Sequence, residues 1–435
     1  MNDPNDRSEP TESPDLPERV DVAVIGGGLS GLICARALSR AGRDVHVFEA
    51  EEEIGGRMRT ERHREGFLLD HGFHVTVTGY PSFAREIDAG TLDLQPFDPG
   101  CLIARAGRLV PLTDPERGGS LREALAFPLA SLGDKWKLRG MRNRLRGEDE
   151  AAIRRRPDRA ALDHLRGLGF SEKVIGSFFV PFFRGVFLDP DLGISSRYFE
   201  SVFKALDAGP VGIPAAGTGA IPRQVAAAIP DGAIHTSARV DGLLGDGDAV
   251  EGIRVGEREV RAERTVLAVE PSVAAELSGL EMPEYAHRGV TVCYFTADRP
   301  PTEEKRLVVV AEPGTWTSHF AVLSNVAPAL APEGRHLLMG AILGTHDIHD
   351  GDISEKIRHD MAYYFPHGLT HTWRWLRTVK LPHAQWALEP GMAERLPEAR
   401  TRRPGLVLAG DLTREPSVEG AIRSGLEAAE AVAGN

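Results

Sequence analysis

The sequence is poor in cysteine, with only Cys34, Cys101 and Cys293 among 435 residues, and it contains no Cys-x-x-Cys pair. Cysteines so far apart build neither a disulfide framework nor a zinc ribbon. At about 150 residues per domain, the length predicts two or three domains with ample core. We therefore expect a protein of a reducing compartment, located in the cytoplasm.

Long apolar runs are also absent. No stretch approaches the ~20 apolar residues that a membrane span requires. Residues 1–18 (MNDPNDRSEPTESPDLPE) are rich in proline and acidic residues and have no apolar core, so we expect a disordered tail and not a signal peptide. These absences do not exclude a protein that attaches to one face of a membrane without crossing it.

Positive charge is scarce: 51 basic residues stand against 63 acidic ones, a net charge of -12, and only seven of the basic residues are lysines. This balance repels nucleic acid, so no nucleic-acid partner is expected. Residues 135–159 are the exception, with ten basic and four acidic residues and with Trp136, Met141 and Leu145 at roughly helical spacing. Such a segment is either a helix lying on an anionic bilayer or a solvated helix face with arginine stems over core.

The clearest motif follows Val20–Ile25, an apolar run typical of a strand buried in a parallel sheet. Gly26-Gly27-Gly28-Leu29-Ser30-Gly31 comes next and opens an apolar pattern of helical period. In this arrangement Gly26 permits a tight turn, Gly28 leaves room for a pyrophosphate, and Gly31 allows close packing of helix on strand. The helix N-terminus offers free N–H groups to phosphate.

A second predicted strand, Asp44–Phe48, ends at Glu49, about 20 residues beyond the glycines. A carboxylate there can accept hydrogen bonds from both ribose hydroxyls of an adenosine. Strand, glycine loop, helix, strand and acid together predict a dinucleotide site.

Gly55-Gly56-Arg57 follows shortly after this acid, and no NAD site requires a second glycine pair with a cation there. At this point the sequence resembles the flavin-dependent amine oxidase and carotenoid desaturase superfamily. The resemblance implies FAD as cofactor, with Gly55 and Gly56 in a loop along its pyrophosphate and ribityl chain. It further implies that Arg57 contacts a phosphate or the flavin and that Arg59 is a neighbour.

The C-terminal part carries a matching pattern. Gly405–Ala409 is a short predicted strand that ends at Gly410-Asp411, and Ser417–Gly425 (SVEGAIRSG) opens a helix that runs to about Val432. By resemblance, the Asp411 carboxylate bonds a ribityl hydroxyl, and the helix start at Val418 and Glu419 faces the pyrimidine edge of the flavin. Ser417–Gly425 is similar to the corresponding run of plant-type phytoene and zeta-carotene desaturases, which have methionine where this chain has Val418.

Residues 231–269 predict a β-meander with strands at 234–236, 240–244, 250–255, 259–260 and 265–269. By resemblance, the backbone of Val240 lies against the adenine, although an ordinary strand valine explains the same residue. The Gly-x-Gly-x-x-Gly pattern does not recur after a later strand, which excludes the two-nucleotide-domain flavin disulfide reductases.

These patterns predict an α/β protein with a Rossmann-type FAD-binding domain built from discontinuous segments (19–80, 206–285 and 396–435). The intervening residues (81–205 and 286–395) are expected to form an α+β substrate domain with a mixed sheet and helices. Eight of the 17 phenylalanines fall between Phe170 and Phe203. Pro181 and Gly185 interrupt a regular helix there, and the cluster is either plain core or the wall of an apolar substrate tunnel.

Flavin oxidations transfer a hydride to the ring, so no acid-base constellation is required of the protein. No catalytic side chain is assigned; His71 and His74, which the resemblance places beside the flavin ring, and Ser417 are candidates. No metal site is expected from the His71/His74 or His346/His349 pairs, because such spacing is common by chance.

Two absences bear on the substrate. The strand His287–Phe295 has no lysine, whereas superfamily amine oxidases place one on the matching strand, and Ser417 stands where they often place a cage tyrosine. We therefore expect an FAD oxidoreductase, free or peripherally membrane-bound, acting on a small apolar substrate such as an isoprenoid or carotenoid. An oxygen-using amine oxidase, a redox-neutral flavin isomerase and a non-catalytic FAD-binding protein are the alternatives. The electron acceptor and oligomeric state are not predicted.

Overall fold

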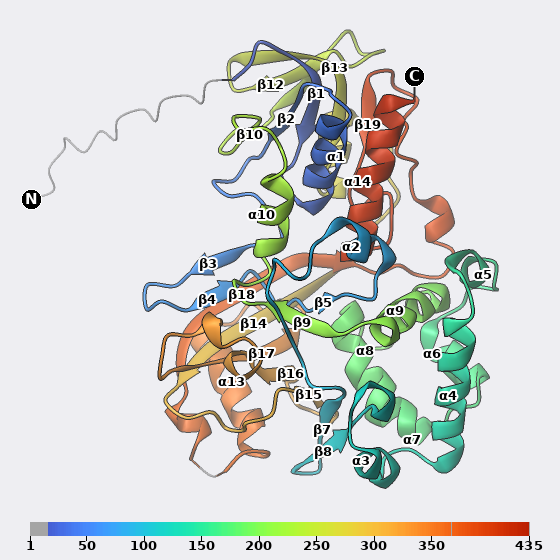
Figure 1. The fold of residues 1–435 in the computed structure, drawn as a ribbon, viewed down its shortest axis with the longest axis vertical. Coiled ribbons are helices and arrows are strands. Elements are labelled where there is room, and N and C mark those ends of the chain that lie inside the picture. The colour runs from blue at the N-terminus through green and yellow to red at the C-terminus, as the bar shows by residue number, and fades with distance from the viewer. Residues whose placement is uncertain (1–15, 367, 435) are drawn as a thin grey trace, which may run out of the picture.

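The structure is a computed structural model that describes residues 16–366 and 368–434. Most of the expected N-terminal tail, residues 1–15, lies outside the described residues. No helix within the described ranges is both long enough and apolar enough to cross a bilayer. Two large sheets lie at opposite ends of an elongated molecule, one beside both described chain ends and the other below it (Figure 1).

The upper sheet is mainly parallel and has the order β10-β2-β1-β13-β12-β11, with β19 also paired to β13. Its strands are β1 (Arg19–Ile25), β2 (Val45–Phe48), β10 (Ile234–His235), β11 (Gly242–Leu244), β12 (Gly252–Val255), β13 (Arg258–Leu267) and β19 (Leu406–Leu408). β1 runs parallel to β2 and β13, and β19 runs parallel to β13. The N-terminal and C-terminal strands predicted from the sequence therefore lie in one sheet, two strand positions apart.

The predicted meander is only partly right. β11, β12 and β13 do pair antiparallel in sequence. The runs expected at 259–260 and 265–269 are one long strand, because β13 continues through the polar residues between them to reach β1 and β19. The first run is β10, which leaves the meander and extends the parallel side by pairing with β2.

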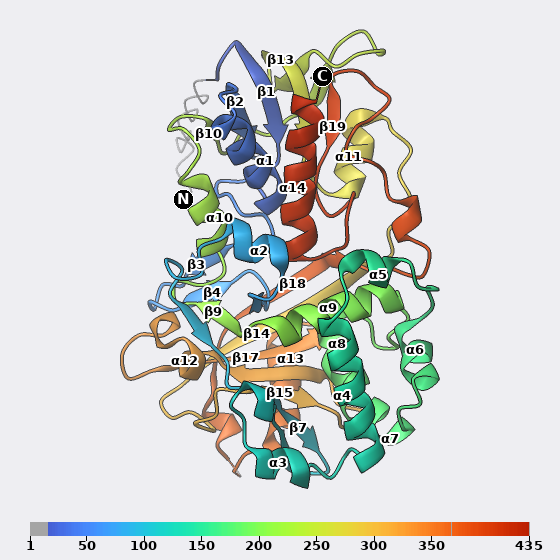
Figure 2. The same ribbon diagram turned by 45° about the vertical axis from the view of Figure 1, so that its right-hand side comes forward.

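Helices cover the upper sheet and join it to the rest of the molecule. They are α1 (Leu29–Arg40), α2 (Pro81–Glu86), α10 (Ala220–Ala226), α11 (Pro271–Ser278) and α14 (Val418–Ala433). α1 and α14 lie side by side, as both views show (Figures 1 and 2). The apolar faces of these two helices share one core with β1 and β2.

The lower sheet is mostly antiparallel, in the order β18-β14-β17-β16-β15-β7-β8, with β15 and β7 parallel. Its strands are β7 (Cys101–Arg105), β8 (Arg108–Leu112), β14 (His287–Ala297), β15 (Leu307–Val310), β16 (Thr317–Val322), β17 (His336–Leu343) and β18 (Arg374–Trp386). Helices α12 (Leu323–Val326) and α13 (Asp350–Ala362) connect and cover it. The alternating runs at 290–295 and 307–310 are thus sheet strands, as predicted.

Two small sheets complete the β-structure. β3 (Thr60–Arg62) pairs with β4 (Leu68–Asp70), and β9 (Val211–Pro214) lies between β5 (Thr76–Val77) and β6 (Leu94–Pro96). The second of these joins chain segments that pass between the two large sheets. The domain limits at residues 80, 205, 285 and 395 stay a prediction.

A group of helices from residues 121–208 flanks the lower sheet (Figure 2). They are α3 (Leu121–Ala126), α4 (Leu132–Arg146), α5 (Glu150–Arg154), α6 (Ala161–Gly167), α7 (Glu172–Val174), α8 (Val180–Phe187) and α9 (Ser196–Ala208). Between α7 and α8 the chain stays helical but forms a π-helical turn over Ile175–Phe179. The irregularity predicted at Pro181 is this π-helical turn just before it, and the missing N–H of Pro181 needs no partner at the start of α8. The interruption predicted at Gly185 is wrong, because α8 continues through Gly185 to Phe187.

The basic segment 135–159 is not one continuous membrane-lying helix. It forms α4 and α5, and the side chains of Met141 and Leu145 are buried whereas Trp136 is exposed. Five of its eight arginines are paired: Arg142 with Asp114 and Asp207, Arg144 and Arg156 with Glu200, Arg146 with Glu116 and Asp207, and Arg154 with Glu150. Much of the local positive charge is thus neutralised by acidic residues distant in sequence.

Candidate functional site

A cavity of about 1770 Å³ lies between the two large sheets. It begins at the glycine-rich loop after β1, passes the N-terminus of α14 and the phenylalanines of α8 and α9, and reaches α3 and α4. Ten of the residues predicted to hold the cofactor line it: Gly26, Gly28, Glu49, Gly55, Gly56, Arg57, Val240, Gly410, Asp411 and Val418. The fold thus brings together positions that are up to 392 residues apart in the numbering (26 and 418).

The three motif glycines serve different purposes. Gly26 has φ +104°, and a Cβ there would lie 2.4 Å from the Ala268 carbonyl oxygen. A Cβ on Gly31 would lie 2.1 Å from the Gly26 carbonyl oxygen, so Gly31 allows α1 to approach β1 and does not itself line the cavity. Around Gly28, apart from the residues adjacent to it in the chain, no described atom lies within 4 Å of the Cβ position. Gly28 is therefore the one of the three that leaves open space for a ligand.

Glu49 follows β2, is buried, and lines the cavity. Its carboxylate accepts hydrogen bonds from the Gly27 N–H at 2.7 Å and the Glu51 N–H at 2.9 Å, one on each oxygen. Each oxygen keeps a lone pair for another donor. The side chain thus braces the glycine loop and still presents acceptors to ribose hydroxyls.

The Gly55–Arg57 loop lies against the first glycine loop. Gly55 and Gly28 form a parallel bridge, and Gly55 and Gly56 both adopt positive φ, +112° and +56°. Arg57 forms an ion pair with Asp411 at 2.7 Å and donates to the Ala384 carbonyl at 3.1 Å. The Asp411 charge raises the pKa of the Arg57 guanidinium.

Arg59, predicted as a neighbour, also lines the cavity and pairs with Glu51 at 3.6 Å.

The C-terminal loop presents a second helix N-terminus. Gly410 has φ +111°, and its N–H donates to the Ser424 hydroxyl at 2.8 Å. Ser417 caps α14 by accepting the Gly420 N–H at 2.9 Å, and Ser417 and Val418 line the cavity. The positive end of the α14 dipole therefore faces the cavity.

Glu419 differs from the expectation of a cofactor contact. It does not line the cavity; its buried carboxylate accepts the N–H groups of Ser82 and Phe83, at 3.0 and 3.2 Å, and so caps α2. Those N–H groups are otherwise unsatisfied at a helix start, which explains this use of the side chain.

His71 and His74 both line the cavity, and the His74 ring nitrogen lies 3.4 Å from the His71 carbonyl. Burial lowers the pKa of both imidazoles, with Arg59 and Arg57 nearby acting in the same direction. Both are thus neutral near pH 7. Together with Ser417 they remain the nearest catalytic candidates, and no role is assigned to them. In the described part of the chain, no group of three or more potential ligands could hold a metal ion.

The residues at this end fit FAD. An open position at Gly28 and two helix N-termini match a pyrophosphate and an anionic ring, and Glu49 matches a ribose. The Arg57 guanidinium offers hydrogen-bond donors and the Asp411 carboxylate offers acceptors for the ribityl chain, which joins the pyrophosphate to the flavin ring. The contact of each residue with the cofactor stays a prediction.

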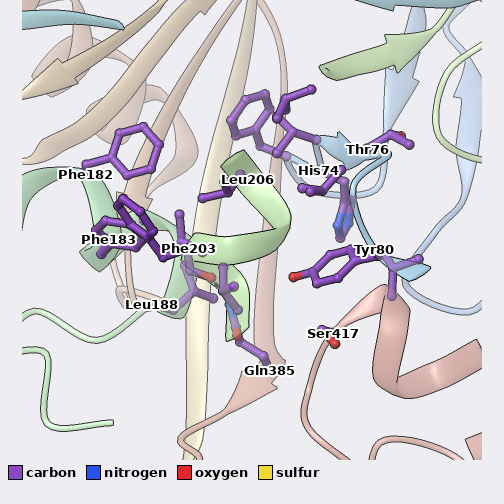
Figure 3. Close-up of a pocket in the computed structure, with 18 of the residues that line it drawn as sticks. His74, Thr76, Tyr80, Phe182, Phe183, Leu188, Phe203, Leu206, Gln385 and Ser417 are labelled. Atoms are coloured by element: carbon purple, nitrogen blue, oxygen red, sulfur yellow. Dashed lines mark hydrogen bonds between the residues drawn. The ribbon is translucent and has the colours of Figure 1, made fainter. Parts of the chain in front are cut away.

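The other end is apolar. Phe178, Phe182 and Phe203 are only partly buried and line the cavity, whereas Phe187 and Phe199 are fully buried behind them. The phenylalanine cluster is therefore both wall and core, a division that the sequence left open. Figure 3 shows Phe182, Phe183 and Phe203 on one side of the pocket and His74, Tyr80 and Ser417 on the other.

Sequence reasoning missed several lining residues. His319 on β16 is buried against Gly185, and a Cβ on Gly185 would lie 2.0 Å from its ring. Burial lowers the pKa of His319 to about 3, so it adds no charge to the cavity. Tyr198, whose hydroxyl donates to the Pro416 carbonyl at 3.0 Å, was also missed. Aromatic residues at irregular spacing gave no signal for either position.

Comparison with known proteins identifies the family. Residues 29–433 match the family described as flavin containing amine oxidoreductase. Hydroxysqualene dehydroxylase of Rhodopseudomonas palustris is 46% identical over 59 residues, which cover 13% of this chain and 14% of that protein. The 15-cis-phytoene desaturase of Synechococcus elongatus is 33% identical over 64 residues, or 15% of this chain and 14% of that protein.

A crystal structure of an oxidoreductase from Methanosarcina mazei has the same fold, with a TM-score of 0.71 at 19% identity, covering 94% of this chain and all of that one. The curated matches span only about a seventh of those relatives, 14% of each. These relatives include a dehydroxylase and a desaturase. The comparisons therefore do not resolve whether this chain is closer to the plant-type desaturases than to other members of the family, as the sequence suggested. The family match covers nearly the whole described chain: this protein belongs to the flavin-containing amine oxidoreductase family and is an FAD-dependent oxidoreductase.

Proposed function

We propose that the protein dehydrogenates an apolar substrate, with an isoprenoid as the leading candidate, held against the phenylalanine wall of the cavity. The observation that carries this proposal is the wall itself. Phe178, Phe182 and Phe203 present partly exposed rings to a space continuous with the cofactor end. Burying such surface against an apolar ligand stabilises the complex by roughly 25 cal/mol per Å².

The lysine distribution argues against a primary amine as substrate. Within the described residues, Lys135 is the single lysine that lines the cavity, and it lies at the end remote from the glycine loop. β14 carries none, and Lys380 on the neighbouring β18 pairs with Asp350 at 2.9 Å, away from the cavity. Ser417 caps α14 instead of supplying an aromatic ring.

When bound, FAD supplies a hydride acceptor. The protein contributes orientation, exclusion of water and charge stabilisation. The wall orients an apolar chain and excludes water from it. Burial lowers the pKa of His71, His74 and His319, so these three side chains add no positive charge to the cavity near pH 7. The N-terminus of α14 stabilises negative charge that develops next to Ser417 and Val418.

The test uses purified holoprotein under anaerobic conditions, with candidate substrates in detergent micelles. We expect an isoprenoid precursor of carotenoids to bleach the oxidised-flavin absorbance, and putrescine and benzylamine to leave it unchanged. Bleaching by an amine, followed by hydrogen peroxide release in air, would select an amine oxidase and overturn the proposal. Turnover only after prior reduction would select an isomerase and also overturn it.

Phe182→Asn tests the wall. Removing this ring should raise KM for the apolar substrate by roughly 10-fold or more, since burial of one phenylalanine side chain contributes about 1.5–3 kcal/mol. FAD content should not change. Tyr363→Asn is the matched control, because Tyr363 is an exposed aromatic residue outside this cavity. An unchanged KM in Phe182→Asn would place the substrate elsewhere.

A further inference from the structure

Four large apolar side chains are exposed within one short stretch of the chain. Leu121 and Leu125 of α3 are 62% and 63% exposed, and Leu132 and Trp136 in the first turns of α4 are 71% and 74% exposed. Elsewhere in the described ranges only Val273, Trp316 and Tyr363 are large, apolar and exposed. An exposed apolar group gathered in one place marks an interaction surface.

This group lies at the end of the cavity opposite the glycine loop. All four side chains line the cavity, together with the partly buried Leu138. α3 and the start of α4 lie at the end of the molecule farthest from the nucleotide-binding sheet (Figure 2). The exposed surface and the apolar cavity are therefore continuous.

Basic side chains accompany the apolar ones. Residues 121–141 hold four basic and two acidic residues. Among the described residues, none of Arg122, Lys137 and Arg139 forms an ion pair, and all three are exposed. The paired arginines of the segment begin only at Arg142.

Both acidic residues of this stretch, Glu123 and Asp134, already have partners within the protein. Glu123 pairs with Arg306 at 3.2 Å. The buried Asp134 carboxylate accepts hydrogen bonds from Ser131 and Ser171, which fixes the start of α4. Because Asp134 is buried and Glu123 is paired with a cation, the exposed Arg122, Lys137 and Arg139 give this surface a net positive charge, on a chain whose total is -12.

We propose that Leu121, Leu125, Leu132 and Trp136, with Arg122, Lys135, Lys137 and Arg139, form a docking surface for an anionic phospholipid bilayer. Apolar side chains insert into the acyl boundary, tryptophan suits the headgroup level, and cations attract anionic lipids. The cavity opens among these side chains, so an apolar substrate passes from the acyl layer toward the phenylalanine wall without crossing water. That passage rests on the proposed function; the docking does not.

The positive charge of this surface favours an anionic bilayer, and not a second copy of this chain, as its binding partner. Two such surfaces would bring cations together, which repels, whereas the headgroups of phosphatidylglycerol complement them. The proposed docking surface differs from the one considered from the sequence, which was a continuous helix over residues 135–159. It begins earlier, on α3, and ends where the ion-paired arginines begin.

The experiment is flotation of the purified holoprotein with vesicles of phosphatidylcholine alone or mixed with phosphatidylglycerol. We expect binding to the mixed vesicles, weakened by salt. Leu132→Ser/Trp136→Ser should weaken it by roughly tenfold or more, because two inserted apolar side chains are removed. The matched control Tyr363→Ser removes an equally exposed ring and should bind as the unmodified protein does.

Charge is tested separately. Arg122→Gln/Arg139→Gln should weaken binding to the mixed vesicles by about 30-fold at low salt, since each cation near an anionic surface contributes about fivefold. Arg62→Gln/Arg299→Gln removes the same charge from exposed positions elsewhere and should have little effect. In brominated-lipid vesicles, the tryptophan fluorescence should be quenched, and Trp136→Phe should remove that quenching.

Absence of flotation with the mixed vesicles, or equal flotation of the surface variants and their controls, would overturn the proposal. A stable dimer that Leu132→Ser/Trp136→Ser dissociates, without vesicle binding, would assign the surface to a second copy and also overturn it. The bleaching assay in micelles needs no bilayer. Flotation without bleaching therefore contradicts only the proposed function, and bleaching without flotation contradicts only the docking.

Discussion

Substituting the three motif glycines one at a time should separate a glycine that the ligand needs from glycines that the fold needs. Gly28 has φ -72° and ψ 172°, which any L-residue adopts, and apart from the adjacent residues in the chain no described atom lies within 4 Å of its Cβ position. In Gly28→Ala, the less favourable N-cap costs about 0.5–1 kcal/mol. Reduced freedom of the unfolded chain offsets about 0.4–1 kcal/mol. The free energy of unfolding of the apoprotein should thus change by less than about 1 kcal/mol.

FAD binding should respond differently. The new methyl group occupies the space left for the pyrophosphate, and overpacking of this kind costs about 1–3 kcal/mol. Any weakened hydrogen bond to a charged phosphate adds to this cost. We expect the Kd for FAD to rise by about 30-fold, equivalent to about 2 kcal/mol. Titration of the apoprotein with FAD, followed by quenching of flavin fluorescence, measures the change.

Gly26→Ala and Gly31→Ala are the contrasting variants. Their Cβ atoms would lie 2.4 and 2.1 Å from backbone carbonyl oxygens, and Gly26 also has positive φ. Each should lower the apoprotein's free energy of unfolding by more than about 2 kcal/mol. If Gly28→Ala binds FAD as tightly as the unmodified protein, or destabilises the apoprotein as much as the other two, the reasoning fails.

Three further predictions concern other parts of the molecule. Glu49→Gln should weaken FAD binding by about 10-fold or more while the apoprotein stays folded, because the neutral amide loses charge-assisted acceptors; equal FAD content after dialysis would refute this. Although burial raises it, the hydrogen bonds from Ser131 and Ser171 bring the pKa of Asp134 down to about 2. This carboxylate should therefore contribute about 2 kcal/mol of stability above its unfolded pKa, lost as the pH falls from about 4 to 2, and urea titrations of Asp134→Asn should lack that acid-dependent loss. Gly185→Ala should destabilise the protein by about 1–3 kcal/mol, and adding His319→Ala should recover part of that loss; additive effects would show that the ring is not the obstacle.

Local pattern was enough to predict the nucleotide end of the fold. β1, α1, β2, β19 and α14 all begin or end within about two residues of their expected positions, because each combines a buried apolar run with a glycine or capping residue at its boundary. The two glycine loops and Glu49 are placed by the same short-range signals.

What could not be predicted depends on residues that meet only in three dimensions. The pairing of Arg144 with Glu200, or of Arg142 with Asp207, joins separate helices, so composition alone overstated the charge of residues 135–159. Glu419 looked like a cofactor contact because nothing near it in sequence revealed that α2 needs a cap. The π-helical turn at Ile175–Phe179 and the packing of α9 against α8 likewise decide which phenylalanines face the cavity.

The close approach of α1 and α14 has a consequence for biosynthesis. A Cβ on Gly425 would lie 2.4 Å from the Ser30 carbonyl oxygen, and β19 completes the sheet beside β13. The cradle that begins with the Gly26–Gly31 loop is therefore closed by Gly410–Val418, which are translated much later than that loop. We therefore expect a nascent chain that stops before Gly410 to carry an intact glycine motif but to retain no FAD, because it lacks the second helix N-terminus that faces the cavity.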